Sequence, residues 1–336
     1  MSRDLLFAIA AGVASALAGL AFLARAPGAI LLIYLGPLPL MLVGLGLGVR
    51  AAFTAAGVGV LVSGLLAGAP AALLYAIGHA LPSLIVVWLG LSNRVGVDIL
   101  VEGSAEDDSK NGLAEGRIPG PTEWYPHGHI AAWLAALAAV TVAFAGLWLS
   151  SGEGFRATVS GHIETGLAAL IPMLGGTDRT QIIAAMIGLF PGWIGVSWVA
   201  MGVMNAVAAE GILVRAGRAL RPKPAWADLT LPDWLSWALV GAALLALIGS
   251  GDVGYTGRNL ALALALPHFL LGLAVVHGLV DRTAQPRALL AGFYIVLFVS
   301  AWALLAVAAV GMLEHWIGIR NRIPGGPRPG TNPPGT

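Results

Sequence analysis

The sequence predicts an all-α fold: a polytopic transmembrane helix bundle with one interfacial amphipathic helix. Of the 336 residues, 58% are hydrophobic and only 10% are charged, whereas a soluble domain carries about 25% charged residues. The charged residues also cluster in a few loops, which leaves long uncharged runs between them. Because a helix in a soluble protein needs polar residues along its outer face, these runs are expected to face lipid.

The uncharged runs supply about nine membrane spans, since about 20 helical residues cross the ~30 Å hydrocarbon layer. The run 51–93 is too long for a single crossing and breaks at Gly68 and Pro70, which gives two helices. The predicted spans are 5–24, 26–49, two within 51–93, 130–149, 182–209, 234–250, 259–280 and 288–313.

Lysine and arginine in the loops predict the orientation, because cytoplasmic loops are enriched in them. The densest basic cluster is Arg215, Arg218, Arg221 and Lys223. If this cluster is cytoplasmic, the N-terminus is cytoplasmic too. With nine spans the tail that carries Arg320 then falls outside. An eight-span alternative, in which 234–250 does not cross, returns that tail to the cytoplasm.

The spans divide the chain into two groups. Residues 1–93 form an N-terminal membrane bundle of four spans, and residues 130–320 form a C-terminal bundle of five. Between them, 94–129 reads as a polar and largely disordered loop, and 321–336 reads as a disordered tail. Within the second bundle, 155–174 has apolar residues at helical spacing. This pattern predicts an amphipathic helix in the membrane interface, or a short extramembrane helix packed on the bundle.

Composition argues against several chemistries. The chain has no cysteine, so thiolate nucleophiles, disulfides and iron–sulfur sites are excluded. No charged residue lies near the middle of a predicted span, which weighs against a proton pump or an intramembrane protease. With a net charge of +1 and no basic stripe, we expect no nucleic acid partner. We therefore predict a protein that is not an enzyme and that has no cofactor.

The pair His127 and His129, with Glu123 nearby, has a spacing that permits a metal site. Trp124 and Tyr125 stand beside the pair, and aromatic residues of this kind gather at membrane surfaces. An aromatic belt is the interpretation that we prefer, and we predict no metal site.

Prolines interrupt four predicted spans, at Pro37, Pro82, Pro191 and Pro267. Each proline frees a backbone carbonyl, which needs a partner inside the protein or in a wet cavity, and transporters line substrate sites with such breaks. Proline is also simply more frequent in membrane helices than in soluble ones. Polar residues near the breaks are the candidates for lining a cavity: Tyr34, His79, Ser83, Asn205 and His268.

Small residues recur every fourth position of the first span, at Ala8, Gly12 and Ala16. A face of small side chains lets two helices approach closely. We therefore predict that these three residues form a helix-packing face.

Several segments together resemble the YybS-like bacterial membrane proteins (domain of unknown function 2232), in their alphaproteobacterial form. The segments are 34–39, 123–126, Gly128, Asn205, 215–222, 231–232, 272–277, 311–314 and Arg320. The resemblance implies a location in the bacterial inner membrane. It also implies a distant similarity to the substrate-binding subunits of energy-coupling-factor vitamin transporters, in which a small-residue face on the first helix docks a membrane partner.

Two hypotheses for the function follow. The first is a small-molecule binding or transport component that contacts the lipid bilayer, a small-molecule ligand and a membrane partner docked on the first span. The alternative is a non-enzymatic structural or assembly scaffold of the bacterial cell envelope. The proline breaks and the resemblance favour the first hypothesis.

Overall fold

The computed structural model describes residues 2–21, 23, 28–95, 99–100, 117–118, 122–150, 152–167 and 178–322. The helices are α1 (Arg3–Leu20), α2 (Ala29–Leu35), α3 (Pro37–Leu47), α4 (Val49–Tyr75), α5 (Leu81–Gly90), α6 (His127–Leu149), α7 (Phe155–Leu167), α8 (Asp178–Arg215), α9 (Asp233–Ile248), α10 (Gly251–Val280), α11 (Pro286–Val299), α12 (Ala301–Ile317) and α13 (Ile319–Arg322). A π-helical turn, Ala76–Ala80, joins α4 to α5. The strands are β1 (Asn93–Val95), β2 (Ile99–Leu100), β3 (Arg117–Ile118) and β4 (Thr122–Trp124).

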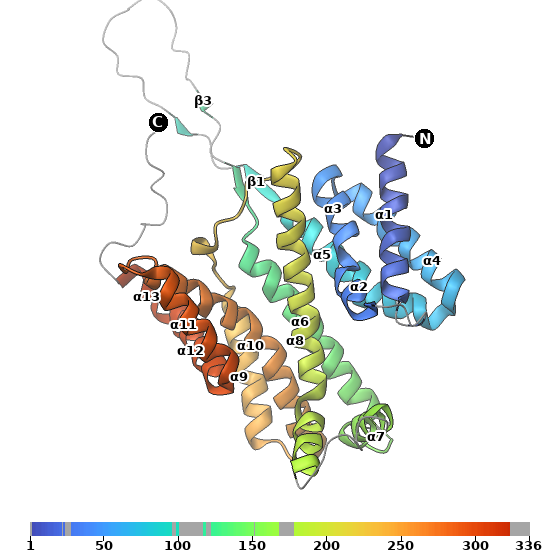
Figure 1. Ribbon diagram of the computed structural model, residues 1–336, viewed down its shortest axis with the longest axis vertical. Coiled ribbons are helices and arrows are strands. Elements are labelled where there is room, and N and C mark those ends of the chain that lie inside the picture. The colour runs from blue at the N-terminus through green and yellow to red at the C-terminus, as the bar shows by residue number, and fades with distance from the viewer. Residues whose placement is uncertain are drawn as a thin grey trace, which may run out of the picture.

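The long helices run side by side as a bundle (Figure 1), which confirms the predicted helical membrane fold. In the described part of the chain, six helices are long and apolar enough to cross a membrane, and there are up to seven if the bent pair α11–α12 is one span. Helix α9 is apolar but has only 16 residues. Large apolar side chains cover much of the outer surface, as expected where the solvent is lipid.

The segment Val49–Gly90 reverses direction at Gly68, whose φ is 84°. The chain before Gly68 lies against the chain after it. Gly59 lies directly against the Tyr75 ring, and a Cβ on Gly64 would lie 3.3 Å from the Ala72 Cβ. On a straight helix, positions 59 and 75 would be about 24 Å apart. The break predicted here is therefore confirmed, and the segment passes through the bundle twice.

Helix α9 runs antiparallel to α10, because Ser236 near its start bonds to His268 while the Leu245 region near its end lies against Gly257. The chain then turns by 117° between α11 and α12. Arg320, just after α12, donates to the Leu229 carbonyl in the loop before α9 (2.9 Å). This contact puts the tail at the same end as that loop, the placement that the eight-span alternative gives. The chain departs from nine straight crossings at the extended Ser300, which breaks the predicted last span.

The two ends of the polar loop 94–129 form paired strands, which the prediction of a largely disordered loop does not include. Strand β1 pairs antiparallel with β4, and β2 pairs antiparallel with β3. Helix α6 then starts at His127, three residues before the expected span. Residues 101–116, the acidic part of the predicted disordered loop, and the predicted disordered tail from 323 to 336 lie outside the described residues.

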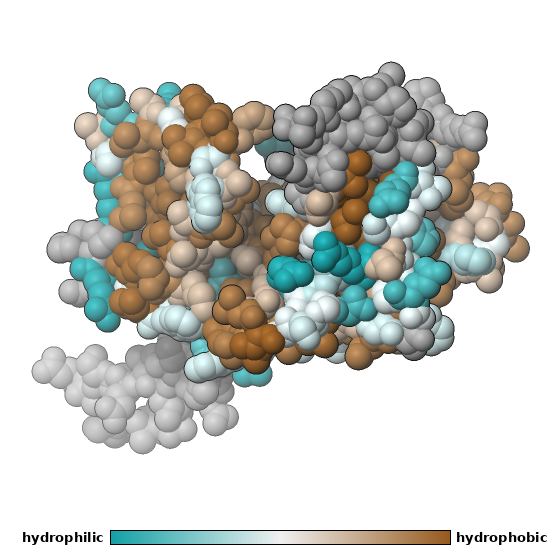
Figure 2. All heavy atoms as spheres, turned by 90° about the horizontal axis from the view of Figure 1, so that it is seen from below, coloured by the Kyte–Doolittle hydropathy of each residue, from teal (hydrophilic) through white to brown (hydrophobic). Residues whose placement is uncertain are grey.

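Helix α7 confirms the amphipathic helix over its described length, although 168–174 lie outside the described residues. Phe155 and Ile163 are buried against the bundle while Arg156 is exposed. Asp252, at the start of α10, accepts from the backbone amides of Phe155 (2.8 Å) and Arg156 (3.2 Å). This carboxylate caps a helix N-terminus, where a negative charge is favourable. Figure 2 shows polar residues gathered around α7 at this end of the molecule.

Helix α8 joins the two predicted bundles into one packed unit. Its Val199 and Leu213 belong to a buried cluster that includes Met41 of α3, Val87 of α5 and Leu134 of α6. The N-terminal and C-terminal halves thus share a core along α8. The small-residue face of α1 is buried as well, because Ala8, Gly12 and Ala16 pack against α4.

The burial of that face corrects one prediction. Gly12 lies so close to α4 that a Cβ would collide with the Ala55 carbonyl oxygen. The face predicted from Ala8, Gly12 and Ala16 is a helix-packing face, but its partner is α4 of the same chain. It offers no free surface for docking a separate membrane protein.

Candidate functional site

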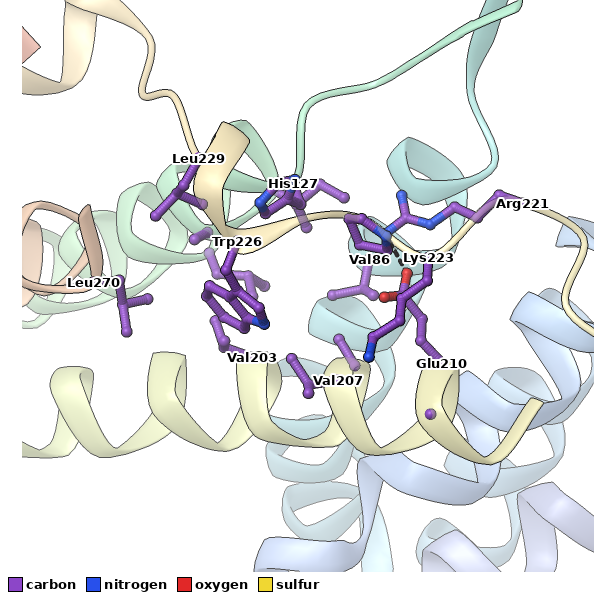
Figure 3. A pocket seen from close by; sticks show the side chains of 16 residues that line it. Val86, His127, Val203, Val207, Glu210, Arg221, Lys223, Trp226, Leu229 and Leu270 are labelled. Atoms are coloured by element: carbon purple, nitrogen blue, oxygen red, sulfur yellow. Dashed lines mark ion pairs between the residues drawn. The ribbon is translucent and has the colours of Figure 1, made fainter. Parts of the chain in front are cut away.

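A pocket lies where α5, α6, α8 and α10 meet the irregular segment 216–225, which we call the strap (Figure 3). Its volume is about 80 Å³. The residues that line it are Val86, His127, Ile130, Ala131, Leu134, Val203, Ala206, Val207, Glu210, Gly211, Arg221, Lys223, Pro224, Trp226, Leu229 and Leu270. We refer to it as the strap pocket.

An ion pair between Glu210 and Arg221 ties the strap to α8. Glu210 stands near the end of α8, and the two side chains are only 14% and 9% exposed. Arg221 also donates from Nη1 to the Gly90 carbonyl at the end of α5 (3.1 Å). One guanidinium therefore fixes the strap to two helices. Its Nε is buried and has no hydrogen-bond partner among the described residues.

Two more groups bring donor capacity to the strap pocket. Lys223 extends from the strap toward α8 (Figure 3) and has no hydrogen bond or ion pair with another described residue. His127, at the start of α6, has its Nε2 buried without a partner in the described part of the chain. The Trp226 ring meets the His127 ring edge-on at 6.0 Å. Within the pocket two cations face one carboxylate, which leaves a surplus positive charge.

The rest of the strap pocket is apolar, with Val86, Leu134, Val203 and Leu270 among its walls. Drug-sized ligands usually occupy about 300–1,000 Å³, so about 80 Å³ encloses only part of such a molecule. The arrangement brings together apolar walls, a surplus cation and buried donors without partners. This combination suits binding, and it contains no pairing of a nucleophile with a base among the described lining residues.

Two predicted cavity residues, Tyr34 and Asn205, line a different feature, an open apolar groove of about 640 Å³ between α2 and α8. Asn205 donates from Nδ2 to the Tyr34 carbonyl (2.7 Å), and the Tyr34 hydroxyl meets Ser197. The structure brings these two candidates together, but at a site separate from the strap pocket.

His79 and Ser83 lie inside helix contacts. Pro37 has no amide hydrogen, so the Ile33 carbonyl four residues earlier loses its usual helical donor and accepts from the Gly36 amide instead (3.0 Å). His79 Nε2 lies 3.2 Å from this carbonyl oxygen and must donate to it, because a carbonyl only accepts. Ser83 in turn donates to the His79 carbonyl (2.7 Å). These two candidates therefore satisfy backbone groups.

His268 forms a buried pair with Ser236, a contact that no sequence pattern indicates because 32 residues separate the two. The Ser236 hydroxyl lies 3.0 Å from His268 Nε2, and His268 Nδ1 faces the Leu264 carbonyl (3.3 Å). A serine beside a histidine nitrogen is the geometry of a nucleophile and its base. Here both side chains are at most 1% exposed, so a substrate has no access and the pair joins α9 to α10.

His127 and His129 contact different aromatic neighbours. His127 meets Trp226, and His129 meets the Tyr125 ring edge-on at 5.7 Å. The described residues contain no group of three or more side chains that could hold a metal ion. These ring contacts fit the aromatic belt that the sequence favours.

The sequence patterns did not point to Glu210, to Trp226 or to the convergence of Arg221 and Lys223 on one pocket. In the sequence the two cations indicate only the orientation, and Glu210 stands one residue beyond the predicted span that ends at 209. A carboxylate at a span end, followed 11 residues later by an arginine, was the available signal.

The comparison with protein families gives one match. The model of the DUF2232 family, described as a predicted membrane protein, matches residues 127–314, more than half of the chain. The chain belongs to this family. No curated protein and no solved structure matches it.

The DUF2232 region runs from the start of α6 into the end of α12 and includes most of the strap pocket. Several residues that carry the family resemblance make packing contacts around the loop before α9. A Cβ on Gly128 would collide with the Thr230 carbonyl, and Leu231 is buried in a core cluster. Glu314 pairs with Arg320 at 2.7 Å. They hold the loop before α9 against the bundle, so their role is packing.

Proposed function

We propose that this DUF2232 protein is a membrane-embedded component that binds a small molecule, with the strap pocket as its site. The observation that carries the proposal is the combination of apolar walls with buried donors that have no partner among the described residues. An unpaired donor in an apolar site is costly, and a ligand acceptor would remove that cost at Arg221, and also at His127 in the tautomer whose Nε2 carries the proton. The resemblance to transporter subunits favours a role in transport, for which a docking face other than that of α1 is needed.

We further propose that the protein lies in the bacterial inner membrane with its N-terminus in the cytoplasm. Basic residues support this orientation because they collect at one end of the bundle. Arg3 lines a crevice with Arg218 of the strap, and Arg320 bonds to the loop that follows the strap. Cytoplasmic ends are enriched in such residues.

A non-enzymatic role is part of the proposal. The Ser236–His268 pair has catalytic distances, but its burial supports a role in helix packing. A scaffold of the cell envelope is the second candidate function. The observation that favours it is that side chains of neighbouring helices occupy the carbonyls at the proline breaks, as His79 does at Pro37, so these carbonyls do not need a wet cavity. A scaffold requires a stable protein partner and no small-molecule ligand, so crosslinking in cells that recovers no stable partner would exclude the scaffold.

The test uses Gly211, which lines the strap pocket and at which a Cβ would meet open space. Gly211→Leu should fill the pocket without straining the backbone. The matched control is Gly241→Leu in α9, where a Cβ also meets open space and the residue is exposed. We expect native mass spectrometry of gently purified protein to detect a bound small molecule in wild type and Gly241→Leu.

In Gly211→Leu this bound species should be reduced by at least about tenfold, which corresponds to a loss of about 1.4 kcal/mol of binding free energy. A bound species that survives unchanged in Gly211→Leu would place the ligand elsewhere. Two negative results together would refute the binding function: wild-type protein purified without a bound small molecule, and no stabilisation in a thermal-shift screen of vitamins, nucleobases, amino acids and amphiphiles.

A further inference from the structure

We propose that the strap pocket takes the anionic, phosphate-type head group of an amphiphile whose apolar chain leaves through the mouth of the pocket. This inference rests on the proposed function and names its ligand class. Three features of the pocket carry it: the surplus charge, the partnerless donors and the small volume with an apolar exit.

The charge balance favours an anion. The Arg221 charge is already compensated by Glu210 at close range, so an incoming ligand meets a nearly neutral pair beside the Lys223 ammonium. Lys223 extends over the pocket from the strap and has no carboxylate partner among the described residues. Basic pockets between membrane helices at the cytoplasmic side are suited to lipid phosphates.

The partnerless donors favour an oxygen-rich group. Arg221 Nε is a permanent donor because the guanidinium does not lose its proton in proteins, yet this nitrogen is buried without an acceptor in the described part of the chain. The Arg221 side chain as a whole is only 9% exposed. His127 Nε2 is the second buried nitrogen in the pocket without a described partner. A phosphate presents several acceptor oxygens, which suits a pocket lined by these two residues and Lys223.

The volume and the mouth favour an amphiphile over a compact metabolite. A cavity of about 80 Å³ has room for a head group but not for a vitamin-sized molecule, which needs about 300 Å³ or more. Val207 and Trp226 line the pocket and are 44% and 45% exposed, respectively. They form an apolar rim, and a chain that leaves over Val207 and Trp226 runs onto the lipid-facing surface of the bundle.

The experiment measures the thermal stability of the purified full chain in dodecyl maltoside with dodecyl phosphate added. We expect dodecyl phosphate to raise the Tm of wild type by a few degrees. This is the shift expected for one site when the ligand concentration is about 100 times its Kd. Uncharged dodecanol and inorganic phosphate should each raise the Tm by much less, since dodecanol lacks the phosphate and inorganic phosphate lacks the apolar chain. Added salt should weaken the effect.

Lys223→Gln should weaken the apparent affinity for dodecyl phosphate about fivefold, the effect of one basic residue near a lipid phosphate. The matched control is Arg218→Gln in the same strap, because this residue lies outside the strap pocket and lines the crevice beside Arg3. Arg218→Gln should bind as wild type does. Both changes remove one exposed positive charge. A difference between the two variants in affinity for dodecyl phosphate therefore shows that the ligand binds in the strap pocket.

Three outcomes would overturn the inference: dodecanol as effective as dodecyl phosphate, inorganic phosphate as effective as dodecyl phosphate, or equal affinities in Lys223→Gln and Arg218→Gln. If dodecanol stabilises wild type but not Gly211→Leu, the pocket binds an apolar ligand, and the proposed function stands without the anionic class. If none of these compounds distinguishes wild type from Gly211→Leu, and no other ligand is found, the proposed function fails too.

A second arm identifies the source of the head group. In nanodiscs of phosphatidylglycerol, a bilayer lipid would already occupy the pocket, so dodecyl phosphate should add stability only in phosphatidylcholine nanodiscs. An equal gain in both lipids would assign the site to a soluble amphiphile instead. Either result supports the phosphate-type head group, while no gain in either lipid contradicts it.

Discussion

Single side chains close the backbone gaps that prolines open in this bundle. Pro191 leaves the Ile187 carbonyl of α8 without its amide donor, and the Tyr255 hydroxyl of α10 donates to it at 2.7 Å. Asn259, one turn further along α10, reaches the same break, where its Oδ1 accepts from the Gly192 amide (2.8 Å). At this break α10 supplies the polar partners that water would supply outside a membrane.

The break at Pro82 follows the same rule. The carbonyl four residues before it belongs to Gly78, and the Trp198 indole of α8 donates to this oxygen at 2.7 Å. From the sequence, the freed carbonyls were predictable, because proline chemistry fixes their positions. The donors were not, since Tyr255 and Trp198 are distant in sequence and meet the breaks only through helix packing.

Tyr255→Phe tests this capping. The change removes one hydroxyl from a side chain that is 0% exposed and leaves the Ile187 carbonyl without this donor. We expect a loss of about 1 kcal/mol in the free energy of unfolding, within the range of hydrogen bonds between membrane helices. The measurement is unfolding in mixed micelles with increasing SDS. Tyr294→Phe is the control. This hydroxyl, on an exposed residue, pairs with His277 (3.2 Å), so the Tyr294→Phe protein should lose less stability than Tyr255→Phe.

Among the contacts between helices, two glycines set the crossing of α10 and α12. A Cβ on Gly272 would collide with the Val307 carbonyl oxygen, and a Cβ on Gly311 would collide with the His268 carbonyl oxygen. The two backbones therefore touch with no side chain between them, the close approach that small residues permit in membranes. Both glycines are among the positions that carry the family resemblance. The sequence marked them, but only the packing shows that they face each other.

Gly311→Ala should separate the two helices. The added methyl has no space beside the His268 carbonyl, so one helix must shift, at a cost of about 2 kcal/mol for overpacking. A drop in Tm of the purified protein measures this. Gly292→Ala in α11 is the matched control, because a Cβ there meets open space and alanine is the better helix former. A Gly311→Ala protein as stable as Gly292→Ala would contradict the close crossing.

The molecule as a whole brings several of its basic segments to one end. The start of α1 lies beside the strap, and α13 bonds to the loop before α9. The 117° turn between α11 and α12 returns the tail to this end. With the tail on the strap side, Arg320 lies at the same end as the strap, as the enrichment of basic residues in cytoplasmic segments predicts. Nine full crossings would place Arg320 at the opposite end.

Labelling of single cysteines can test this topology directly, because the chain has no cysteine of its own. Cysteines at Ser2, Ala219 and Arg322 should react with a membrane-impermeant maleimide only after the cells are permeabilised. A cysteine at Ala157, an exposed position of α7, should react in intact cells. Labelling of Arg322→Cys together with Ala157→Cys would mean that the tail crosses the membrane and would contradict the turn at Ser300.

The order of residues is enough to establish that this chain is a helical membrane protein, where most of its spans lie and to which family it belongs. Those properties depend on local composition, because lipid demands long uncharged helices and breaks show as prolines and glycines. Which polar groups meet became known only from the packed fold. Glu210 and the strap cations form a pocket because α8 ends where the strap crosses it, whereas His79 and His268 are occupied in contacts between helices. Contacts between distant segments depend on how the helices pack, and in this chain no local pattern encodes that.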